Sequence, residues 1–559
     1  MFVPKLFTCL KNYSKEQFIK DFIAGIIVAI IALPLAIALA IASGVSPEKG
    51  IYTAIIGGFI VSLLGGSRVQ IGGPTGAFVV IVFGIVQKFG IDGLIISTIM
   101  AGIMLILMGL LKFGSMLKYI PYPITTGFTS GIAILIFSTQ IKDFFGLSMA
   151  SVPSEFFPKW GAYISSFSTF NAQSTIIGIV SLLIIVFWPK INKKIPGTLI
   201  AIVLTTVVAL ILNLNVATIG SSFSNISGSL PTISIPHTSF AMIKELMLPA
   251  LTLAILGGIE SLLSAVVADG MIGGSHRSNM ELVAQGLANI FSALFGGIPV
   301  TGAIARTAAN VKNGGRTPVA GIVHSLSLLV ILLVFMPYIK LVPMSSLAAI
   351  LIVVSYNMGE WESFKQMFKA PKSDASVLLV TFSLTLFFDL VIAIGIGMLL
   401  ASLLFMRRMA DVTDVRYILD ESEDEDQLEH IDNIKTPENV SLYEINGPFF
   451  FGAADKFIRA VKELGIPPQV LIIKMSNVPA IDATGYHALV MLYTLCKKHH
   501  TALIILDLQD QPLNALAKYG FIDNLGAPNV CDNVEEALSR ADFLLKKANA
   551  LMRLKNQTL

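Results

Sequence analysis

The chain has 559 residues, of which 54% are hydrophobic and 13% charged, and its mean hydropathy is +0.76. This composition excludes an ordinary water-soluble protein of this length and indicates that most of the chain lies in a membrane. A net charge of +3, from 39 Lys+Arg against 36 Asp+Glu, gives no argument for nucleic-acid binding. Cys9, Cys496 and Cys531 have unrelated spacings, so we expect neither a disulfide framework nor a metal site.

The first 21 residues contain several lysines and no cleavage pattern, which predicts a cytoplasmic tail rather than a cleaved signal. A bilayer core about 30 Å thick needs about 20 apolar helical residues. Charge-free runs of this kind predict seven spans in the first half of the chain. They lie at residues 22–47, 51–67, 69–87, 93–111, 119–141, 160–189 and within 195–243.

The pattern restarts after Lys244 and Glu245 and predicts seven more spans. They lie at 246–269, 282–298, shortly after 303, 317–337, 345–358, and twice in a hairpin at 375–406, which needs a break near Asp389. Basic residues flank the cytoplasmic ends of spans, so the lysine-rich tail and the Arg407–Arg408 pair both predict a cytoplasmic location. Two cytoplasmic ends require an even number of crossings between them, and fourteen is even. The uncharged loop at 214–240 is expected on the outer side of the membrane. Residues 22–408 are therefore predicted to form the membrane domain.

From residue 409 the composition becomes that of a soluble protein. The acidic run Asp420 to Asp426 predicts a solvated linker, which we place at 409–438. Beyond it, the runs "VSLYEI", "VLIIKM" and "ALIILDL" alternate with helical patterns at 452–464, 482–498 and 533–547. Strands alternating with helices predict a small α/β domain at 439–559.

One motif occurs twice, as "GGPTGAF" at 72–78 and as "GGIPVTGAI" at 296–304. Gly and Pro interrupt a helix, and paired interruptions at matching places in two halves are typical of a transporter's binding site. Two half-helices opening at Thr75–Phe78 and Gly302–Ala305 would direct N–H groups and positive dipole ends at an anion. The candidate binding residues are Thr75, Gly76, Ala77, Gly302, Ala303, Ile304 and Ala305. The alternative is that Gly and Pro only permit close packing or kinks.

Two lone charges lie in these apolar segments. Glu260 is the only ionisable residue between Glu245 and Asp269, and Arg306 directly follows the second motif. Charges at membrane depth are costly and usually functional. We expect Arg306 to add positive potential to the anion site, and Glu260, one turn from Ser264, to take up a proton or help ligate a cation. The alternative is a buried structural ion pair between Glu260 and Arg306.

Three motifs, in this order, resemble the sulfate permease (SulP) family of anion transporters. They are "LPLAIALAIASGVSPEKGIYTAIIGGFIVSLLGGSRVQIGGPTGAFVV", "SNMELVAQGLANIFSALFGGIPVTGAIARTAANVKNGG" and "IDATG". The last lies in a region that resembles the STAS domain, and the chain is most similar to the bacterial branch with the aerobic C4-dicarboxylate transporter. The resemblance implies two inverted seven-helix repeats, divided into a core and a gate domain, in a homodimer.

The resemblance also implies roles for individual residues. Thr75 and the run Ala303 to Arg306 match the substrate site between the third and tenth helices, and Glu260 and Ser264 match the proton or sodium coupling site. Vertebrate members have hydroxyl residues where this chain has Ala303 and Ala305, so backbone N–H groups must contribute more here. Thr484 matches a Ser that is phosphorylated in anti-sigma-factor antagonists; the alternative is that Asp482 or Thr484 caps a helix.

These observations predict a multi-pass secondary transporter of the bacterial cytoplasmic membrane, not an enzyme, with both termini cytoplasmic and no cofactor besides the coupling ion. We expect proton-coupled symport of a C4-dicarboxylate, with sodium coupling, bicarbonate and sulfate as alternatives, and a regulatory protein as a partner of the STAS-like region. An anion channel would need no coupling carboxylate such as Glu260. A membrane receptor would leave the paired half-helices unexplained.

Overall fold

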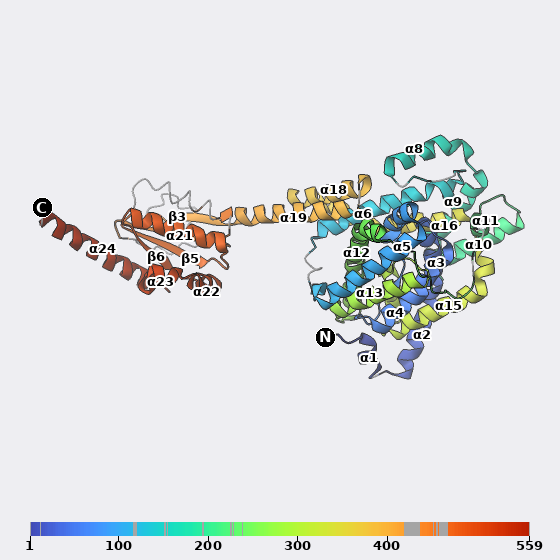
Figure 1. Cartoon of the computed structure of the whole chain (residues 1–559), viewed down its shortest axis with the longest axis horizontal. Helices are drawn as coiled ribbons and strands as arrows, with labels where there is room; N and C mark the ends of the chain where they lie inside the picture. The colour runs from blue at the N-terminus through green and yellow to red at the C-terminus, as the bar shows by residue number, and fades with distance from the viewer. Residues whose placement is uncertain are drawn as a thin grey trace. The chain divides into compact units, whose positions relative to one another are not determined.

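The computed structural model forms two compact units, residues 1–399 and 400–559, which are described separately (Figure 1). The structure describes residues 2–557 except 12, 116–119, 150–151, 154, 193–194, 224–225, 227, 238, 389, 419–436, 451, 454–456 and 458–467. The acidic run at 420–426, most of the predicted helix at 452–464 and Asp389 lie outside the described residues.

Each predicted span has a helical counterpart in the described residues of the chain. In the first half these are α2 (Lys15–Ala42), the continuous α3 (Pro47–Tyr52), η1 (Thr53–Gly57) and α4 (Gly58–Leu64), α5 (Val79–Leu110), α6 (Tyr122–Thr139), α9 (Ala172–Ile191) and α10 (Gly197–Ile211). Gly90 interrupts α5 with a φ of 68°, a left-handed conformation that favours glycine. This kink separates the predicted third and fourth spans.

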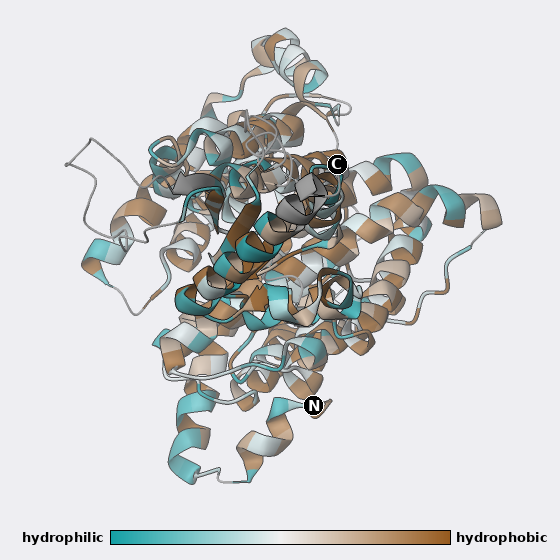
Figure 2. Ribbon diagram, turned by 90° about the vertical axis from the view of Figure 1, so that its left-hand side faces the viewer, coloured by the Kyte–Doolittle hydropathy of each residue, from teal (hydrophilic) through white to brown (hydrophobic). Residues whose placement is uncertain are grey.

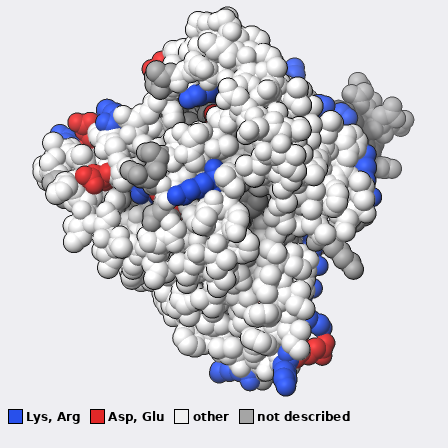
Figure 3. All heavy atoms as spheres, turned by 90° about the vertical axis from the view of Figure 1, so that its right-hand side faces the viewer, with Lys and Arg blue, Asp and Glu red and all other residues white. Residues whose placement is uncertain are grey.

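The second half follows the same plan. Its helices are α12 (Phe240–Ile272), α13 (Ser278–Leu294), α14 (Ile304–Lys312), α15 (Val319–Ile339), α16 (Met344–Met358), α18 (Lys372–Phe387) and α19 (Leu390–Val412). Seven helices of the described chain are both long and apolar enough to cross a membrane, and the other predicted spans are shorter or interrupted. Hydrophobic residues dominate these helices in Figure 2, and the face shown in Figure 3 carries only scattered charged side chains.

The two halves pack reciprocally. Helix α5 packs against α12 and α13, while α2, the counterpart of α12, packs against α14 and α15. In the same way α6 packs against α18, and α9 packs against α16. Between the halves, strand β1 (Gly72–Gly73) pairs antiparallel with strand β2 (Thr301–Gly302). Antiparallel pairing of equivalent segments accompanies opposite chain directions, and the predicted fold of two inverted seven-helix repeats is confirmed.

One predicted span was placed wrongly. The apolar run 160–189 is not one helix, because α8 (Phe156–Ser166) ends before α9 begins. The Asn171 side chain accepts a hydrogen bond from the Ser174 N–H at 3.0 Å and so caps the start of α9. A polar but uncharged turn therefore breaks the run, and a search for charge-free stretches does not detect it. Residues 69–75, predicted as part of the third span, are likewise not helical.

The second unit is an α/β domain around a five-stranded sheet in the order β3-β4-β5-β6-β7. Strands β4 (Val440–Asn446), β5 (Val470–Asn477), β6 (Ala502–Leu506) and β7 (Val530–Cys531) are parallel. The three predicted strands correspond to β4, β5 and β6. The sequence reading missed β3 (Asp414–Ile418), which pairs antiparallel with β4 inside the region predicted as a linker. One short run beside many charges gives little strand signal, and pairing with β4 defines it.

Helices cover both faces of this sheet, and both faces are apolar. They are α21 (Ala483–Lys498), α22 (Asp510–Lys518), α23 (Phe521–Leu525) and α24 (Val534–Gln557). Successive strand residues point to opposite faces. Accordingly Ile473 lies in a core cluster with Leu489 of α21, whereas Ile472 lies in a second cluster with Ala541 of α24. Burial on both faces explains the unbroken apolar runs in the sequence.

Candidate functional site

The strand pair β1–β2 positions the two half-helices of the repeated motif. Residues Gly72 and Gly302 are directly paired, as are Gly73 and Thr301, and the Ala303 N–H donates to the Ile71 carbonyl at 2.9 Å. Just beyond the strands, Thr75 and Ala303 occupy the N-cap positions of the turn η2 (Gly76–Phe78), which leads into α5, and of α14. The structure thus brings together the start of both half-helices, as the sequence predicted.

Two glycines of this pair are required because other side chains lie against them. A Cβ atom on Gly73 would overlap the Arg306 guanidinium, and one on Gly302 would overlap the Gln70 side-chain amide. Glycine within a strand often marks such a close approach. These two glycines therefore provide space for polar side chains at the point where the two half-helices meet.

Glu260 is joined directly to the first half-helix. It lies in the middle of α12, and its Oε2 accepts a hydrogen bond from Thr75 Oγ1 at 2.9 Å. Thr75 is 8% exposed, and Glu260 is partly exposed. The structure therefore links the predicted ion-coupling carboxylate to a predicted substrate-binding residue through one hydrogen bond.

Arg306 is held by the loop before the first half-helix. It is 3% exposed, and its Nη2 donates to the Pro74 carbonyl at 2.6 Å. Its Nη1 is buried and has no hydrogen-bond partner among the described residues. No ion pair joins Arg306 to Glu260 in the described chain, so the alternative of a buried structural ion pair is not what this conformation shows. A buried donor remains available beside the half-helices.

Hydroxyl groups connect α12 to the second half-helix. Ser261 Oγ and Thr301 Oγ1 are 2.6 Å apart, and the Gly302 N–H donates to Ser261 Oγ at 3.1 Å. Ser264, which is 1% exposed, donates to Thr307 Oγ1 at 3.3 Å. Because its hydroxyl points to α14, Ser264 fixes the packing of α12 against α14 in this structure, and a direct role in coupling stays a prediction.

The remaining candidate residues differ in exposure. Gly76 and Ala77 are buried, as are Gly302 and Ala303, whereas Ile304 and Ala305 are exposed at the start of α14. A Cβ on Gly76 would contact Ile136 of α6 and Met358 of α16. The first half-helix thus begins against apolar side chains of helices outside the β1–β2 assembly.

A comparison with Glu281 shows why Glu260 is the unusual carboxylate. Glu281 is fully buried, and its Oε2 accepts from the Gly66 and Ser67 N–H groups at 2.7 and 3.0 Å, while its Oε1 accepts from Gln285 Nε2 at 2.8 Å. These donors stabilise its charge in place. Glu260 has only the Thr75 hydroxyl among the described side chains, so it can change protonation with less disruption of the fold.

The sequence reading missed His324 and Gln70. His324 of α15 is fully buried, and neither ring nitrogen has a hydrogen-bond partner in the part of the chain that the structure describes. A lone histidine in the apolar run 317–337 was the available signal. Gln70 donates from Nε2 to the Ser261 carbonyl at 3.2 Å, and no motif marked it.

In the second unit, the "IDATG" loop begins α21. Asp482 Oδ1 accepts hydrogen bonds from the Thr484 and Gly485 N–H groups at 2.9 and 2.8 Å. Asp482 is therefore the N-cap residue of this helix, one of the two alternatives, and Thr484 is exposed in the first turn. Phosphorylation of Thr484 stays a prediction.

Comparisons with known proteins agree with this architecture. The model of the sulfate permease family matches residues 18–381, and that of the STAS domain matches residues 433–537. A Bacillus subtilis protein named "Putative sulfate transporter YvdB" is 42% identical over 94% of this chain and 98% of its own length. The "Bicarbonate transporter BicA" of Picosynechococcus sp. is 30% identical over 80% of this chain and 81% of its own.

Two solved structures are similar. The transmembrane domain of a cyanobacterium bicarbonate transporter BicA has a TM-score of 0.63 and 30% identity, covering 69% of this chain and 98% of that domain. The overall structure of SLC26A9 has a TM-score of 0.86 and covers 99% of this chain and 94% of its own. Its identity is 19%, so it supports the fold alone.

Proposed function

The chain belongs to the sulfate permease family, and on this basis we propose that it carries a small anion in symport with a proton, at the site between the two half-helices. The observation that carries this proposal is the hydrogen bond from Thr75 to Glu260. It joins a titratable carboxylate to the N-cap residue of the half-helix that faces the substrate. Protonation of Glu260 therefore affects Thr75, and anion binding beside Thr75 affects Glu260.

The anion is received by groups of both repeats. Arg306 Nη1 is a buried donor with no partner in the described chain, and the first N–H groups of each half-helix have no acceptor within their helix. These groups and the two helix dipoles supply positive potential. The ionised carboxylate of Glu260 opposes this positive potential. Protonation of Glu260 removes that opposition, so proton and anion binding favour each other, as linked equilibria require.

Sulfate and bicarbonate are the first candidates for the anion, because similar proteins carry these names. Both are compact oxyanions that match a site of one guanidinium and backbone donors. A C4-dicarboxylate, implied by the resemblance in the sequence, needs donors for a second carboxylate. The dicarboxylate is therefore the third candidate for the anion. Sodium is the alternative to the proton as the coupling ion.

We propose an elevator-type movement for the transport step. The strand pair and the bonds of α12 make the two half-helices one body, whereas Ile136 and Met358 come from helices outside it. Apolar contacts of this kind form no directional bonds and allow sliding. A homodimer, a regulatory protein at the STAS domain and residence in a bacterial cytoplasmic membrane with both termini inside belong to the same proposal.

The test is flux into proteoliposomes that contain the purified full-length protein. We expect an inward proton gradient to drive sulfate or bicarbonate above its external concentration, with succinate as the third substrate and a sodium gradient as the comparison. Protein-free liposomes are the control. Flux that only dissipates an anion gradient indicates a channel, and no flux of any of the three anions contradicts the transporter proposal.

A further inference from the structure

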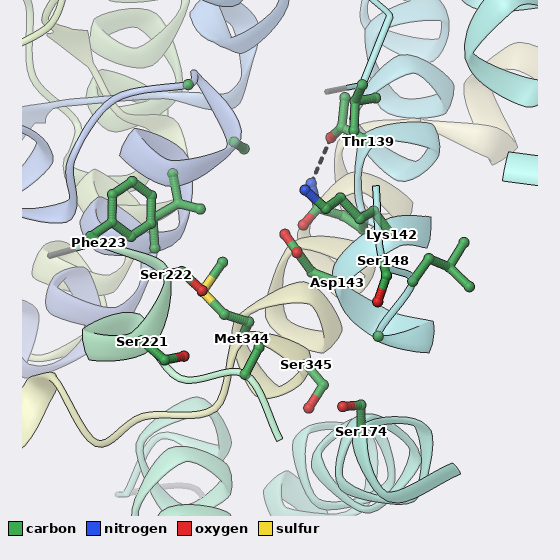
Figure 4. Close-up of a pocket in the computed structure, with 18 of the residues that line it drawn as sticks. Thr139, Lys142, Asp143, Ser148, Ser174, Ser221, Ser222, Phe223, Met344 and Ser345 are labelled. Atoms are coloured by element: carbon green, nitrogen blue, oxygen red, sulfur yellow. Dashed lines mark hydrogen bonds between the residues drawn. The ribbon is translucent and has the colours of Figure 1, made fainter. Parts of the chain in front are cut away.

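A polar cavity lies in the membrane unit, and neither Glu260 nor Arg306 lines it. Its volume is about 820 Å³, and it is lined by the end of α2, by Phe83 and Gln87 of α5, and by the short helices α7 (Ile141–Phe145) and α11 (Ile219–Ser222), with α9 and α16. In Figure 4 the side chains of Lys142, Asp143, Ser222 and Ser345 surround this space. Nothing in the repeated motif lines it.

The polar groups of the cavity are mainly hydrogen-bonding hydroxyls and amides, together with three charged residues. The hydroxyl and amide residues are Gln87, Thr139, Gln140, Ser148, Asn171, Ser174, Asn215, Ser221, Ser222 and Ser345. The charged residues are Lys142, Asp143 and Lys159. Two positive charges against one negative charge leave the cavity with an excess of positive charge at neutral pH.

Lys159 is the residue that indicates a ligand. It lies on α8, is 2% exposed and lines the cavity. Among the described residues none forms a hydrogen bond or ion pair with its ammonium group, and a buried charge without a partner is costly. Burial lowers the pKa of Lys159 to about 8, and an anion beside the ammonium group would stabilise its charged form.

The cavity also adjoins the first half-helix. Phe83 and Gln87 belong to the same half-helix that starts at Gly76, and a rise of 1.5 Å per residue places them roughly 10 to 16 Å further along it. The lining residues of α2 lie at its C-terminal end, and the N-terminal tail joins the opposite end of this helix. The cavity and the proposed site between the half-helices therefore share one helix, α5.

We propose that this cavity is an antechamber that binds a small anion, such as an oxyanion or carboxylate, before it reaches the half-helices. Lys159 is its principal charge and Lys142 its second, while Asp143 moderates the affinity so that the anion is released inward. The assignment rests on the proposed function for its biological purpose. The positive potential of the cavity is measurable without transport.

The test measures that potential with charged thiol reagents. In full-length protein with Cys9, Cys496 and Cys531 replaced by Ser, Ser222→Cys provides one thiol in the cavity. Its thiolate attacks a methanethiosulfonate, forming a mixed disulfide and releasing methanesulfinate. We expect the anionic sulfonatoethyl reagent to react faster, relative to the cationic trimethylammonioethyl reagent, than it does with free cysteine. The rate ratio should fall at least about threefold in Lys159→Gln, because removal of a nearby charge acts on the two reagents oppositely.

Matched variants keep the result interpretable. Lys159→Arg retains the charge and should retain the ratio, Lys142→Gln should lower it, and Lys190→Gln, an exposed lysine outside the cavity, should leave it unchanged. Sulfate added at constant ionic strength should slow the anionic reagent in the parent but not in Lys159→Gln. An unchanged ratio in Lys159→Gln overturns the antechamber. A changed ratio in a protein that shows no flux overturns the transport proposal instead.

Discussion

At the scale of single residues, the site depends on the partners that each charged group has. Glu281 is held by three donors and is a structural charge, whereas Glu260 is held by the Thr75 hydroxyl alone among described side chains. Arg306 Nη2 donates a hydrogen bond to the Pro74 carbonyl, whereas its Nη1 has no partner among the described residues. These differences support the proposal that Glu260 couples transport to the proton and that Arg306 attracts the anion.

The first prediction concerns Glu260→Gln. Glutamine imitates the protonated carboxylic acid and still accepts the Thr75 hydrogen bond, so we expect anion binding and downhill exchange to persist. The dependence of uptake on external pH should disappear, because the titrating group is gone. Uptake measured in proteoliposomes from pH 5.5 to 8.5 checks this. Wild-type uptake with unaltered pH dependence would make Glu260 a structural charge and would end the proton-symport proposal.

The second prediction concerns Arg306→Ala. We expect the affinity for the anion to fall about tenfold or more, since a hydrogen bond to a charged group contributes about 1.5 to 3 kcal/mol. Arg306→Lys keeps the charge but loses the planar group that reaches both Pro74 and the ligand, so its affinity should be intermediate. Equilibrium binding of the anion to purified protein, with a thermal unfolding curve as the folding control, measures both. Unchanged affinity in Arg306→Ala removes this residue from the site.

At the scale of elements, two short strands decide where the half-helices start. Strands β1 and β2 have only two residues each. Their pairing nevertheless holds Thr75 and Ala303, the N-cap residues of the two half-helices, in neighbouring loops. Glycine permits the guanidinium of Arg306 and the amide of Gln70 to lie against the strand backbone. The interruption of each helix is thus a packing requirement as well as part of the proposed binding site.

The third prediction tests that packing. Gly302→Ala places a methyl group on the buried Gln70 amide and should destabilise the membrane unit by about 1 to 3 kcal/mol, as overpacking usually does. Gly84→Ala in α5 is the matched control, since a Cβ there meets no atom within 4 Å and should be neutral or stabilising. The temperature at which each variant loses monodispersity on heating measures the difference. Equal values would show that the close approach at Gly302 is relieved without cost.

The fourth prediction concerns the cap of α21. Asp482→Ala removes the acceptor for two N–H groups and should destabilise the helix start by about 1 kcal/mol. Thr484→Ala leaves this acceptor in place and should have a smaller effect. Amide hydrogen exchange of residues 484–486 in the full-length protein reports the difference. Similar exchange in both variants would remove Asp482 from the capping role.

At the scale of the whole molecule, the chain consists of two units with separate cores. The membrane unit has one large apolar cluster that joins helices of both repeats, and the C-terminal unit has a cluster on each face of its sheet. The hydrophobic side chains of each unit are buried against other side chains of the same unit. Each unit therefore contains the interactions that its own fold requires.

The fifth prediction follows from this division. Deletion of the chain after residue 412 should leave a membrane unit that is extracted in detergent as a folded, monodisperse protein. Transport should be reduced if the STAS domain supports dimer assembly or regulation. Size-exclusion chromatography and flux of the truncated and full-length proteins are the measurements. Aggregation of the truncated protein under conditions in which the full-length protein is monodisperse would contradict two separately folding units.

The inverted relation of the two halves was implied by the family resemblance. The sequence alone predicted the order of the spans, the two matching halves, the α/β character of the C-terminal unit and Glu260, Arg306 and Thr75 as site candidates. These features depend on local composition and on a motif that occurs twice, which a linear pattern records. The sequence did not predict the polar break before α9 or the strand β3, because an uncharged turn and a short paired strand leave weak local signals.

Only the tertiary structure decided which groups are partners. The bond from Thr75 to Glu260 joins residues 185 positions apart, and Arg306 reaches a carbonyl 232 positions away. No spacing in the sequence distinguishes these contacts from a Glu260–Arg306 ion pair. Lys159 and His324, which have no side-chain partner among the residues that the structure describes, likewise become visible only when the helices that bury them are in place. Burial and pairing are properties of packed side chains, and they depend on helices that are distant in the chain.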